Sequence, residues 1–122
     1  MTKISDKIYE IIGTNGFFDE CGYPTEEVLK FIENYEITGY RDFRELMTNF
    51  IPNCWNVNYG RYKVSRLYRK HQKVEYHTGG WSGNEEVISA ILSNHKVLRM
   101  LFYCIRKIDE GEHFYFCFHY YY

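Results

Sequence analysis

The sequence predicts an α+β fold, with N-terminal helices followed by an antiparallel sheet of three to five strands and one helix packed on it. Three observations predict this class. Apolar residues recur at helical spacing through 1–52, alternate at strand spacing in parts of 53–122, and return to helical spacing at about 83–94. The 122 residues contain no repeat and no linker-like stretch, so we expect a single domain, mainly helical over 1–52 and built of the sheet and one helix over 53–122.

The N-terminal part predicts three helices, each with its own start or stop signal. Ser5 is the candidate cap of the first helix, which ends near Gly13. Thr25 is the candidate cap of the second. The third begins after Gly39 and stops at Pro52, because proline cannot continue the hydrogen-bond ladder of a helix. The apolar stripes that support these helices are Ile4, Ile8, Ile11 and Ile12, then Val28, Phe31, Ile32 and Tyr35, and finally Phe43, Leu46, Met47 and Phe50.

The remainder of the chain predicts strands on either side of one helix. The middle holds one or two strands, of which Lys73 to His77 is the clearest, with Asn58-Tyr59-Gly60 as a turn. After the helix, which ends near Asn94, residues 97–108 and 113–122 predict two strands around a turn at 109–111. Both faces of the last strand are apolar or aromatic, so we expect it to be central or to offer one face to a partner. A homodimer would bury such a face.

Composition restricts the classes of function that the chain can have. Thirteen Tyr, nine Phe and two Trp make up 20% of the residues, and such side chains offer large contact area in a core or at an interface. The net charge of -1 argues against a strongly basic DNA binder and against an acidic DNA mimic. However, residues 1–60 hold ten acids and five bases, whereas 61–122 hold six acids and ten bases. We therefore expect a polarised surface.

The cysteines and the hydropathy pattern indicate the compartment. No two cysteines form a CxxC pair, so the spacing of a metal site is absent. The N-terminus lacks the charged and then apolar pattern of a leader, and no apolar run approaches the ~20 residues of a membrane span. We expect a cytoplasmic protein with reduced thiols and no membrane partner. The cysteines are Cys21, Cys54, Cys104 and Cys117.

The stretch HTGGWSGNEEVI, residues 77–88, predicts a loop that starts a helix. Ser82 and Glu85 have the spacing of a capping box, in which each side chain bonds a backbone N–H that the helix start leaves unpaired. The glycine pair before the tryptophan would supply positive φ where the chain turns from strand to helix. This interpretation makes the stretch a scaffold.

Two other interpretations of this stretch are an anion pocket and acid–base chemistry. A glycine-rich turn before a helix can bind an anion, but the phosphate-binding lysine spacing is absent and Glu85 and Glu86 would repel an anion. His77 could pair with either carboxylate, but no nucleophile lies at a recognisable spacing. We predict no enzyme activity and no catalytic, cofactor-binding or metal-binding residues. The alternative left open is that the histidines converge in space, namely His71, His77, His95, His113 and His119.

Residues 61–73 carry six bases and no acid, with Tyr62 and Tyr68 among them. Single-stranded nucleic acids bind such a mixture of positive charge and aromatic stacking surface. Alternatively, the bases decorate a solvated edge strand and prevent edge-to-edge pairing. The candidate nucleic-acid-binding residues are Arg61, Lys63, Arg66, Arg69, Lys70 and Lys73.

HTGGWSGNEEVI, the helix that follows it and the later segment EGEHFYF (110–116) resemble a family of small bacteriophage and prophage proteins. Its members carry a TGGWSGNE segment, an aromatic strand and a Gly-Gly-His-Tyr-type turn into a last strand. The resemblance covers about the C-terminal half of the chain. Glu112 stands in place of the second glycine of that turn. Where relatives have tryptophans, this chain has Leu101, Phe102 and Tyr103, so a site formed by those tryptophans would be altered here.

The resemblance implies a phage context rather than a reaction. Small phage accessory proteins outside the virion often bind and disable a host enzyme. We therefore expect a stoichiometric inhibitor of a host defence system, most specifically an anti-CRISPR protein that contacts a Cas effector or its guide-RNA complex. The alternative function is the binding of RNA or single-stranded DNA through 61–73. The candidate partner-binding residues, which offer aromatic contact area, are Trp81, Tyr120, Tyr121 and Tyr122.

Overall fold

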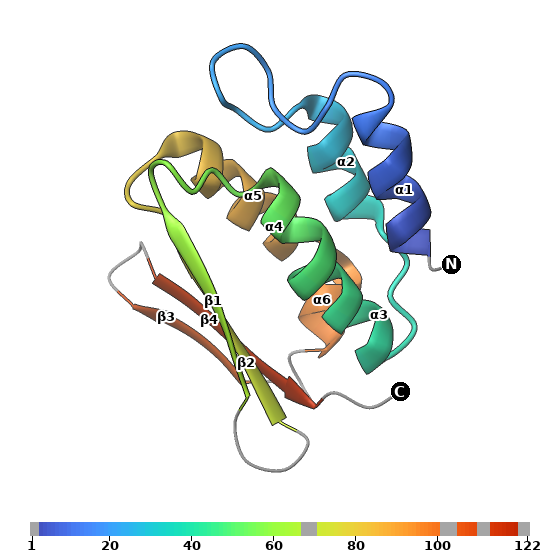
Figure 1. The fold of residues 1–122 in the computed structure, drawn as a ribbon. Helices are drawn as coiled ribbons and strands as arrows, with labels where there is room; N and C mark the ends of the chain where they lie inside the picture. Colours follow the sequence, from blue (N-terminus) through green and yellow to red (C-terminus); the bar gives the residue numbers. More distant parts are fainter. Residues whose placement is uncertain (1–2, 67–70, 101–104, 110–112, 120–122) are drawn as a thin grey trace.

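A computed structural model describes residues 3–66, 71–100, 105–109 and 113–119 and confirms the α+β class (Figure 1). In Figure 1 the helices gather on one side of the sheet. The elements, in chain order, are α1 (Lys3–Ile12), α2 (Glu26–Asn34), α3 (Tyr40–Glu45), the π-helical turn η1 (Leu46–Phe50), α4 (Ile51–Cys54), β1 (Arg61–Arg66), β2 (His71–His77), α5 (Ser82–Ser93), α6 (His95–Met100), β3 (Ile105–Asp109) and β4 (His113–His119).

The four strands pair antiparallel in the order β1-β2-β4-β3. The last strand, β4, is therefore central, as its two apolar faces predict, whereas β1 and β3 form the edges. In the pairing of β1 with β2, Arg61 lies opposite His77 and Tyr62 lies opposite Tyr76. Directly opposite residues share a face of the sheet, so β1 presents alternate residues to the helix side and to the open side.

The core lies between the helices and one face of the sheet. On β2, Val74 and Tyr76 are fully buried, and the residues that alternate with them are partly exposed. The Tyr76 hydroxyl donates a hydrogen bond to the carbonyl oxygen of Met47 in η1, which ties the sheet to the helices. Burial raises the pKa of Tyr76 well above its ordinary 10.0, and burial likewise raises the pKa of the Cys54 thiol.

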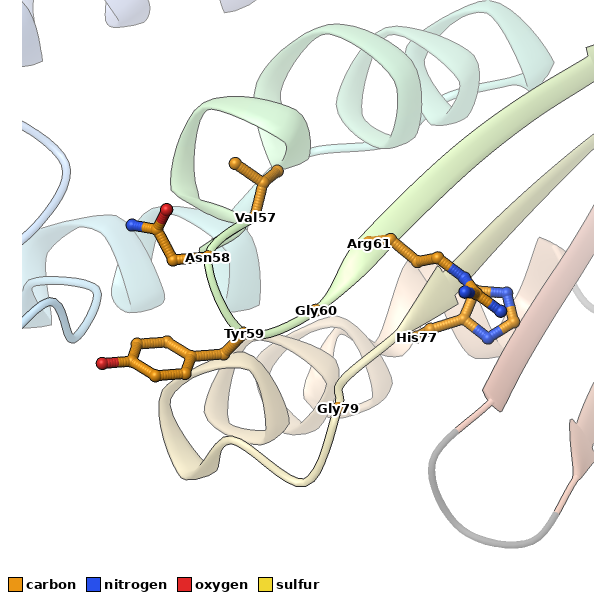
Figure 2. A pocket seen from close by; sticks show the side chains of 7 residues that line it. All are labelled: Val57, Asn58, Tyr59, Gly60, Arg61, His77 and Gly79. Carbon is orange, nitrogen blue, oxygen red and sulfur yellow. The ribbon is translucent and has the colours of Figure 1, made fainter.

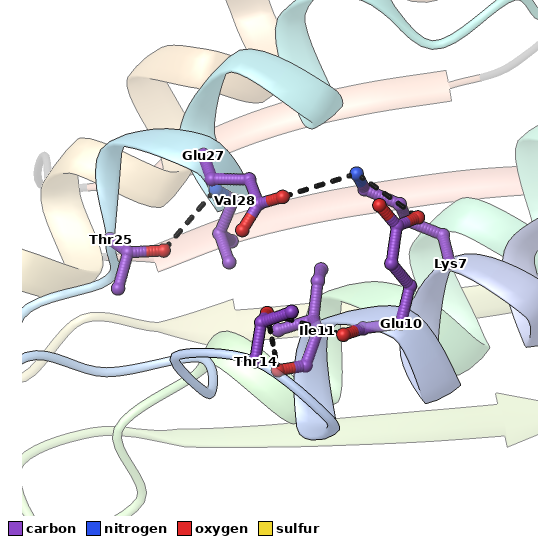
Figure 3. Close-up of polar contacts among 7 residues, drawn as sticks. All are labelled: Lys7, Glu10, Ile11, Thr14, Thr25, Glu27 and Val28. Carbon is purple, nitrogen blue, oxygen red and sulfur yellow. Dashed lines mark hydrogen bonds and ion pairs between the residues drawn. The ribbon is translucent and has the colours of Figure 1, made fainter.

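Polar contacts cap the start of α2 and link it to α1 (Figure 3). The Thr25 hydroxyl accepts a hydrogen bond from the backbone N–H of Val28 at 3.3 Å, which confirms the predicted cap. The ammonium group of Lys7 on α1 lies 3.4 Å from a carboxylate oxygen of Glu27 on α2 and 3.6 Å from one of Glu10. Exposed ion pairs of this kind contribute little to stability, so packing of the apolar faces holds the two helices together.

Two predicted helix boundaries are wrong. Ser5 does not cap α1, because the helix is already formed at Lys3. Pro52 does not end the third helix, because it lies near the start of α4, where its missing N–H is not needed. The preceding π-helical turn makes room for it: the N–H of Ile51 bonds to the carbonyl oxygen of Leu46, five residues back.

Residues 97–100 belong to α6, so the prediction of a strand from Val97 onward is wrong for this part. Asn94 produces the helix. Its side-chain oxygen accepts from the N–H of Lys96 at 2.9 Å, and its amide donates to the carbonyl oxygens of Ile32 at 2.8 Å and Tyr35 at 3.1 Å. The asparagine thus starts α6 and anchors it to the end of α2, where Val97 is fully buried.

Candidate functional site

A buried asparagine joins two loops at one end of the sheet. The first loop, 56–60, leads into β1, and the second, 78–81, leads from β2 into α5, whose first turn contains Asn84. Asn84 is 1% exposed. Its side-chain oxygen accepts from the N–H of Asn56 at 2.8 Å, and its amide donates to the carbonyl oxygens of Asn56 at 3.1 Å and Thr78 at 3.4 Å. One side chain therefore satisfies backbone groups of both loops.

Glycines allow the two loops to approach each other closely. Gly79 has φ +65°, and a Cβ at this position would overlap the carbonyl oxygen of Tyr59. Gly60 makes the reciprocal approach from the first loop, and a Cβ there would overlap the carbonyl oxygen of His77. The positive φ of the pair Gly79 and Gly80, at 65° and 75°, confirms the role that the sequence predicts for it.

Trp81 packs against two tyrosines at the outside of the junction. Its ring is stacked on Tyr59 at a centroid distance of 4.3 Å and 20°, and it lies 4.8 Å from the ring of Tyr23. Gly83 makes room for the indole, because a Cβ there would lie 2.6 Å from its Nε1. That N–H is buried and has no hydrogen-bond partner among the residues whose structure is described. Tyr23, Trp81 and Tyr59, which we call the aromatic stack, fasten the two loops together.

The predicted capping box at the start of α5 is wrong. The cap residue is Trp81, which makes no side-chain cap bond. Its N–H bonds to the carbonyl oxygen of Thr78 at 3.1 Å, and its carbonyl accepts from the N–H of Glu85 at 3.1 Å, so the helix begins at Ser82. The Ser82 hydroxyl instead bonds the hydroxyl of Tyr23 at 2.8 Å. The stretch is a scaffold as predicted, but the aromatic stack and Asn84 hold it rather than Ser82 and Glu85.

A pocket of about 320 Å³ opens beside this junction (Figure 2). In Figure 2, Tyr59 and Asn58 extend to one side of Gly60, and Arg61 and His77 lie together on the other side. Glu85 and Glu86, the carboxylates considered as partners of His77, do not line it. The described lining consists of Val57, Asn58, Tyr59, Gly60, Arg61, His77 and Gly79.

The segment beside the pocket exposes both apolar and basic side chains. Val57 is 63% exposed and Tyr59 55%, and Tyr62 and Val64 on β1 are each 38% exposed. The basic side chains between them are also exposed, and neither forms an ion pair within the described part of the chain. Tyr62 and Val64 point to the helix side of the edge strand, and Arg61 and Lys63 point to the open side. We call this group the β1 surface; it consists of Val57, Tyr59, Arg61, Tyr62, Lys63 and Val64.

The candidate nucleic-acid-binding residues separate into three groups. Arg61 and Lys63 belong to the β1 surface, and Arg66 is the last residue of that strand. Lys73 lies on β2 and forms an ion pair with Glu75 at 3.2 Å, which compensates its charge locally. Outside the described residues lie Arg69, Lys70, the partner-binding candidates Tyr120, Tyr121 and Tyr122, and the family-related positions 101–103 and 110–112.

Within the described ranges, no group of three His, Cys, Asp or Glu side chains is arranged to hold a metal ion. The thiols that the structure describes are free, with Cys21 exposed and Cys54 buried. No helix in those ranges has the length and apolar character that crossing a membrane requires.

No protein-family model, curated protein or solved structure matches the chain. The resemblance of the TGGWSGNE segment to phage proteins therefore stays a prediction.

The sequence did not predict the residues that bond the 78–84 segment, or the exposed residues at one end of the β1 surface. Asn56 and Tyr23 give no local signal, because each acts on residues far along the chain. Val57 precedes the predicted turn Asn58-Tyr59-Gly60, and Tyr59 lies within it. Their exposure could have been suspected, because large apolar residues at a turn have no helix or strand face to pack.

Proposed function

We propose that the protein acts by binding another macromolecule through the β1 surface rather than by transforming a substrate. The observation that supports this is the position of its exposed apolar side chains. Six large hydrophobic residues are exposed in the described part of the chain, and four of them fall within 57–64. Concentrations of exposed apolar groups next to charge are typical of interaction surfaces. An edge strand also has backbone groups that a partner can reach.

The most specific form of this proposal is a phage-encoded accessory protein that inhibits a host defence system stoichiometrically. In this form it is an anti-CRISPR protein that binds a Cas effector in the cytoplasm of the host cell. The resemblance of the TGGWSGNE segment supports the phage setting. The acidic first half of the chain, with ten acids and five bases over 1–60, suits docking beside the basic nucleic-acid channel of an effector.

This proposal is tested by mixing the purified protein with candidate Cas effectors loaded with guide RNA. Complex formation is measured by size-exclusion chromatography and target cleavage by gel assay. We expect a complex with one effector and loss of its cleavage at an equimolar ratio. The double variant Tyr62→Ala, Val64→Ala should lose both activities. An absence of complex and of inhibition across the effectors would overturn the anti-CRISPR form.

A matched control shows whether inhibition depends on the β1 surface or on exposed apolar side chains anywhere on the protein. Tyr9 and Ile12 on α1 are 66% and 61% exposed and lie outside the β1 surface. The double variant Tyr9→Ala, Ile12→Ala should therefore inhibit as the unchanged protein does. Equal loss in both double variants would contradict an interface at β1.

The exposed cations favour a second function, the binding of RNA or single-stranded DNA. Arg61 and Lys63 present uncompensated positive charge on the open side of the edge strand, and Tyr59, which is 55% exposed, precedes them in the chain. Phosphate contacts by cations and stacking on aromatic rings are the two contributions that bind single strands without sequence preference. This function requires no protein partner.

The dependence of binding on salt tests the second function. Each phosphate contact contributes about 0.7 to the slope of log affinity against log salt for a single strand. Changing Arg61 and Lys63 to Ala should therefore reduce that slope by about 1.4. The control variant Lys30→Ala, Arg41→Ala removes the same charge from the helices and should leave the slope unchanged. A flat salt response of the unchanged protein would contradict the function.

A further inference from the structure

The pocket beside the two loops has features that neither proposed function assigns. Its volume of about 320 Å³ is at the lower end of the range of small-molecule sites, which suits one nucleotide unit better than a folded domain. The lining combines an aromatic ring, a primary amide, a guanidinium and an imidazole, contributed by Tyr59, Asn58, Arg61 and His77.

Tyr59 supplies a flat aromatic platform. One face of its ring is stacked on Trp81 at 4.3 Å and 20°, and Trp81 in turn contacts Tyr23. The residue is nevertheless 55% exposed, which leaves room for a further ring on its other face. Because the aromatic stack already fixes the orientation of the phenol, a base that stacks on Tyr59 does not have to order it. Asn58 beside it is exposed, and its amide can both donate to and accept from a base edge.

The opposite side of the pocket can contact a phosphate. Arg61 and His77 are cross-strand partners at the end of β1 and β2, and Figure 2 shows the guanidinium next to the imidazole ring. No carboxylate is present in the described lining, so nothing there competes for the guanidinium. Guanidinium groups bind phosphate oxygens through two parallel N–H bonds. The aromatic and cationic sides are separated by Gly60, as a base and its phosphate are separated by a sugar.

We propose that this pocket binds one nucleotide of a single-stranded nucleic acid, with the base stacked on the outer face of Tyr59 and a phosphate held by Arg61. The inference rests on the nucleic-acid function proposed above and names its specific site. The remaining nucleotides follow β1 past Lys63. Sequence preference is weak in this arrangement, because every base has a face that can stack.

The test uses the full chain and a fluorescein-labelled oligouridylate of about 12 nucleotides, a length within the site size of small single-strand binders. Tyr59→Ala should weaken binding by about tenfold or more, the loss expected for one stacked base. Tyr59→Phe keeps the platform and should bind within about twofold of the unchanged protein. Tyr9→Ala removes an exposed tyrosine from α1 and should bind as the unchanged protein does.

A second measurement keeps the inference testable where Tyr59→Ala destabilises the junction. The oligouridylate carries 5-iodouridine, is crosslinked by light, and the modified peptide is identified by mass spectrometry. We expect the crosslink at Tyr59. Binding by the unchanged protein with crosslinks elsewhere and full affinity of Tyr59→Ala would overturn the pocket and leave the nucleic-acid function standing. No binding by the unchanged protein would overturn both.

Discussion

Residues 78–84 and 57–64 lie next to each other in the fold but use their side chains in opposite ways. The first segment directs them inward: Thr78 and Asn84 are buried, and the glycines approach backbone of the other loop. The second segment directs large apolar and basic side chains outward, with Val57 63% and Tyr59 55% exposed. The conspicuous glycine-tryptophan motif is therefore scaffold, and the less conspicuous segment that it supports forms the exposed surface.

This difference teaches that the unusual composition of a motif does not by itself locate a binding site. Glycine, tryptophan and asparagine at 79–84 are needed because two loops meet there without space for a Cβ and with backbone groups to satisfy. The contrast makes predictions. Changes at Gly79 or Asn84 should reduce stability strongly, whereas changes of exposed side chains of 57–64 that do not belong to the aromatic stack, such as Arg61 and Lys63, should reduce binding with little effect on stability.

The largest effect on the free energy of unfolding is expected from Gly79→Ala. The new Cβ would overlap the carbonyl oxygen of Tyr59, and the residue would be held at φ +65°. Steric overlap and positive φ together should lower the free energy of unfolding by about 3 kcal/mol or more. Gly16→Ala is the matched control, because φ there is +77° but nothing lies within 4 Å of the new Cβ.

The control should lose only about 1 kcal/mol, the cost of the positive φ. Both free energies are measured by urea unfolding followed by circular dichroism. Equal losses in the two variants would contradict a close approach of the loops at Gly79.

Asn84→Ala should have the next largest effect. It removes three hydrogen bonds and leaves the N–H and carbonyl of Asn56 without their partner in a buried position. We expect a loss of about 2–3 kcal/mol in the free energy of unfolding. Asn34→Ala removes one exposed bond to the Lys30 carbonyl and should cost less than about 0.5 kcal/mol. A loss at Asn84 no greater than that at Asn34 would show that the loops are held by other contacts.

The sequence predicts the class of fold and the local elements better than it predicts the junction. Helices and strands have periodic signals, and a local cap such as Thr25 lies within three residues of its partner. The bonds of Asn84 to Asn56 and of Ser82 to Tyr23 span 28 and 59 residues, so no local pattern reveals them.

The wrong predictions of the capping box and of the strand at Val97 have different causes. The capping box has the correct spacing but is displaced by a tertiary contact, because Ser82 bonds Tyr23 instead. The strand prediction at Val97 overlooked a local signal, since Asn94 lies two residues before the first N–H that it caps. The basic residues of 61–73 were found by composition, and only the sheet order places Arg61 and Lys63 on an edge strand.

Alkaline pH should reduce the free energy of unfolding through tyrosines whose pKa burial raises. Burial raises the pKa of Tyr76 well above 10.0 and that of Tyr35 to about 12, with nearby Asp42 and Glu45 adding to the second. Above pH 10 the unfolded chain releases these protons and the folded chain keeps them, so the free energy of unfolding falls as pH rises. Each tyrosine contributes up to about 1.4 kcal/mol per pH unit.

Urea unfolding between pH 10 and 12 measures this slope. Tyr76→Phe removes one of three described groups whose pKa burial raises, the others being Tyr35 and the Cys54 thiol, and should make the decline about one third less steep. An unchanged slope in that variant would contradict a buried, protonated Tyr76.

The smallest effect on stability is expected at the exposed cations. Arg61→Ala and Lys63→Ala remove side chains that have no ion-pair partner in the described part of the chain. Each should change the free energy of unfolding by less than about 0.5 kcal/mol. Thermal denaturation checks this, and a loss comparable to that of Asn84→Ala would mean that these cations belong to the scaffold.

The most direct test of the division between scaffold and surface is one triple variant, Tyr62→Ala, Lys63→Ala, Val64→Ala, measured for both stability and binding. We predict a cooperative unfolding transition, lowered only by the loss of the partly buried Tyr62 and Val64 side chains, of which Tyr62 is stacked on Tyr76. Binding to the Cas effector and to single-stranded RNA should be lost. Binding to either partner at full affinity, in a folded triple variant, would contradict a contact surface on β1.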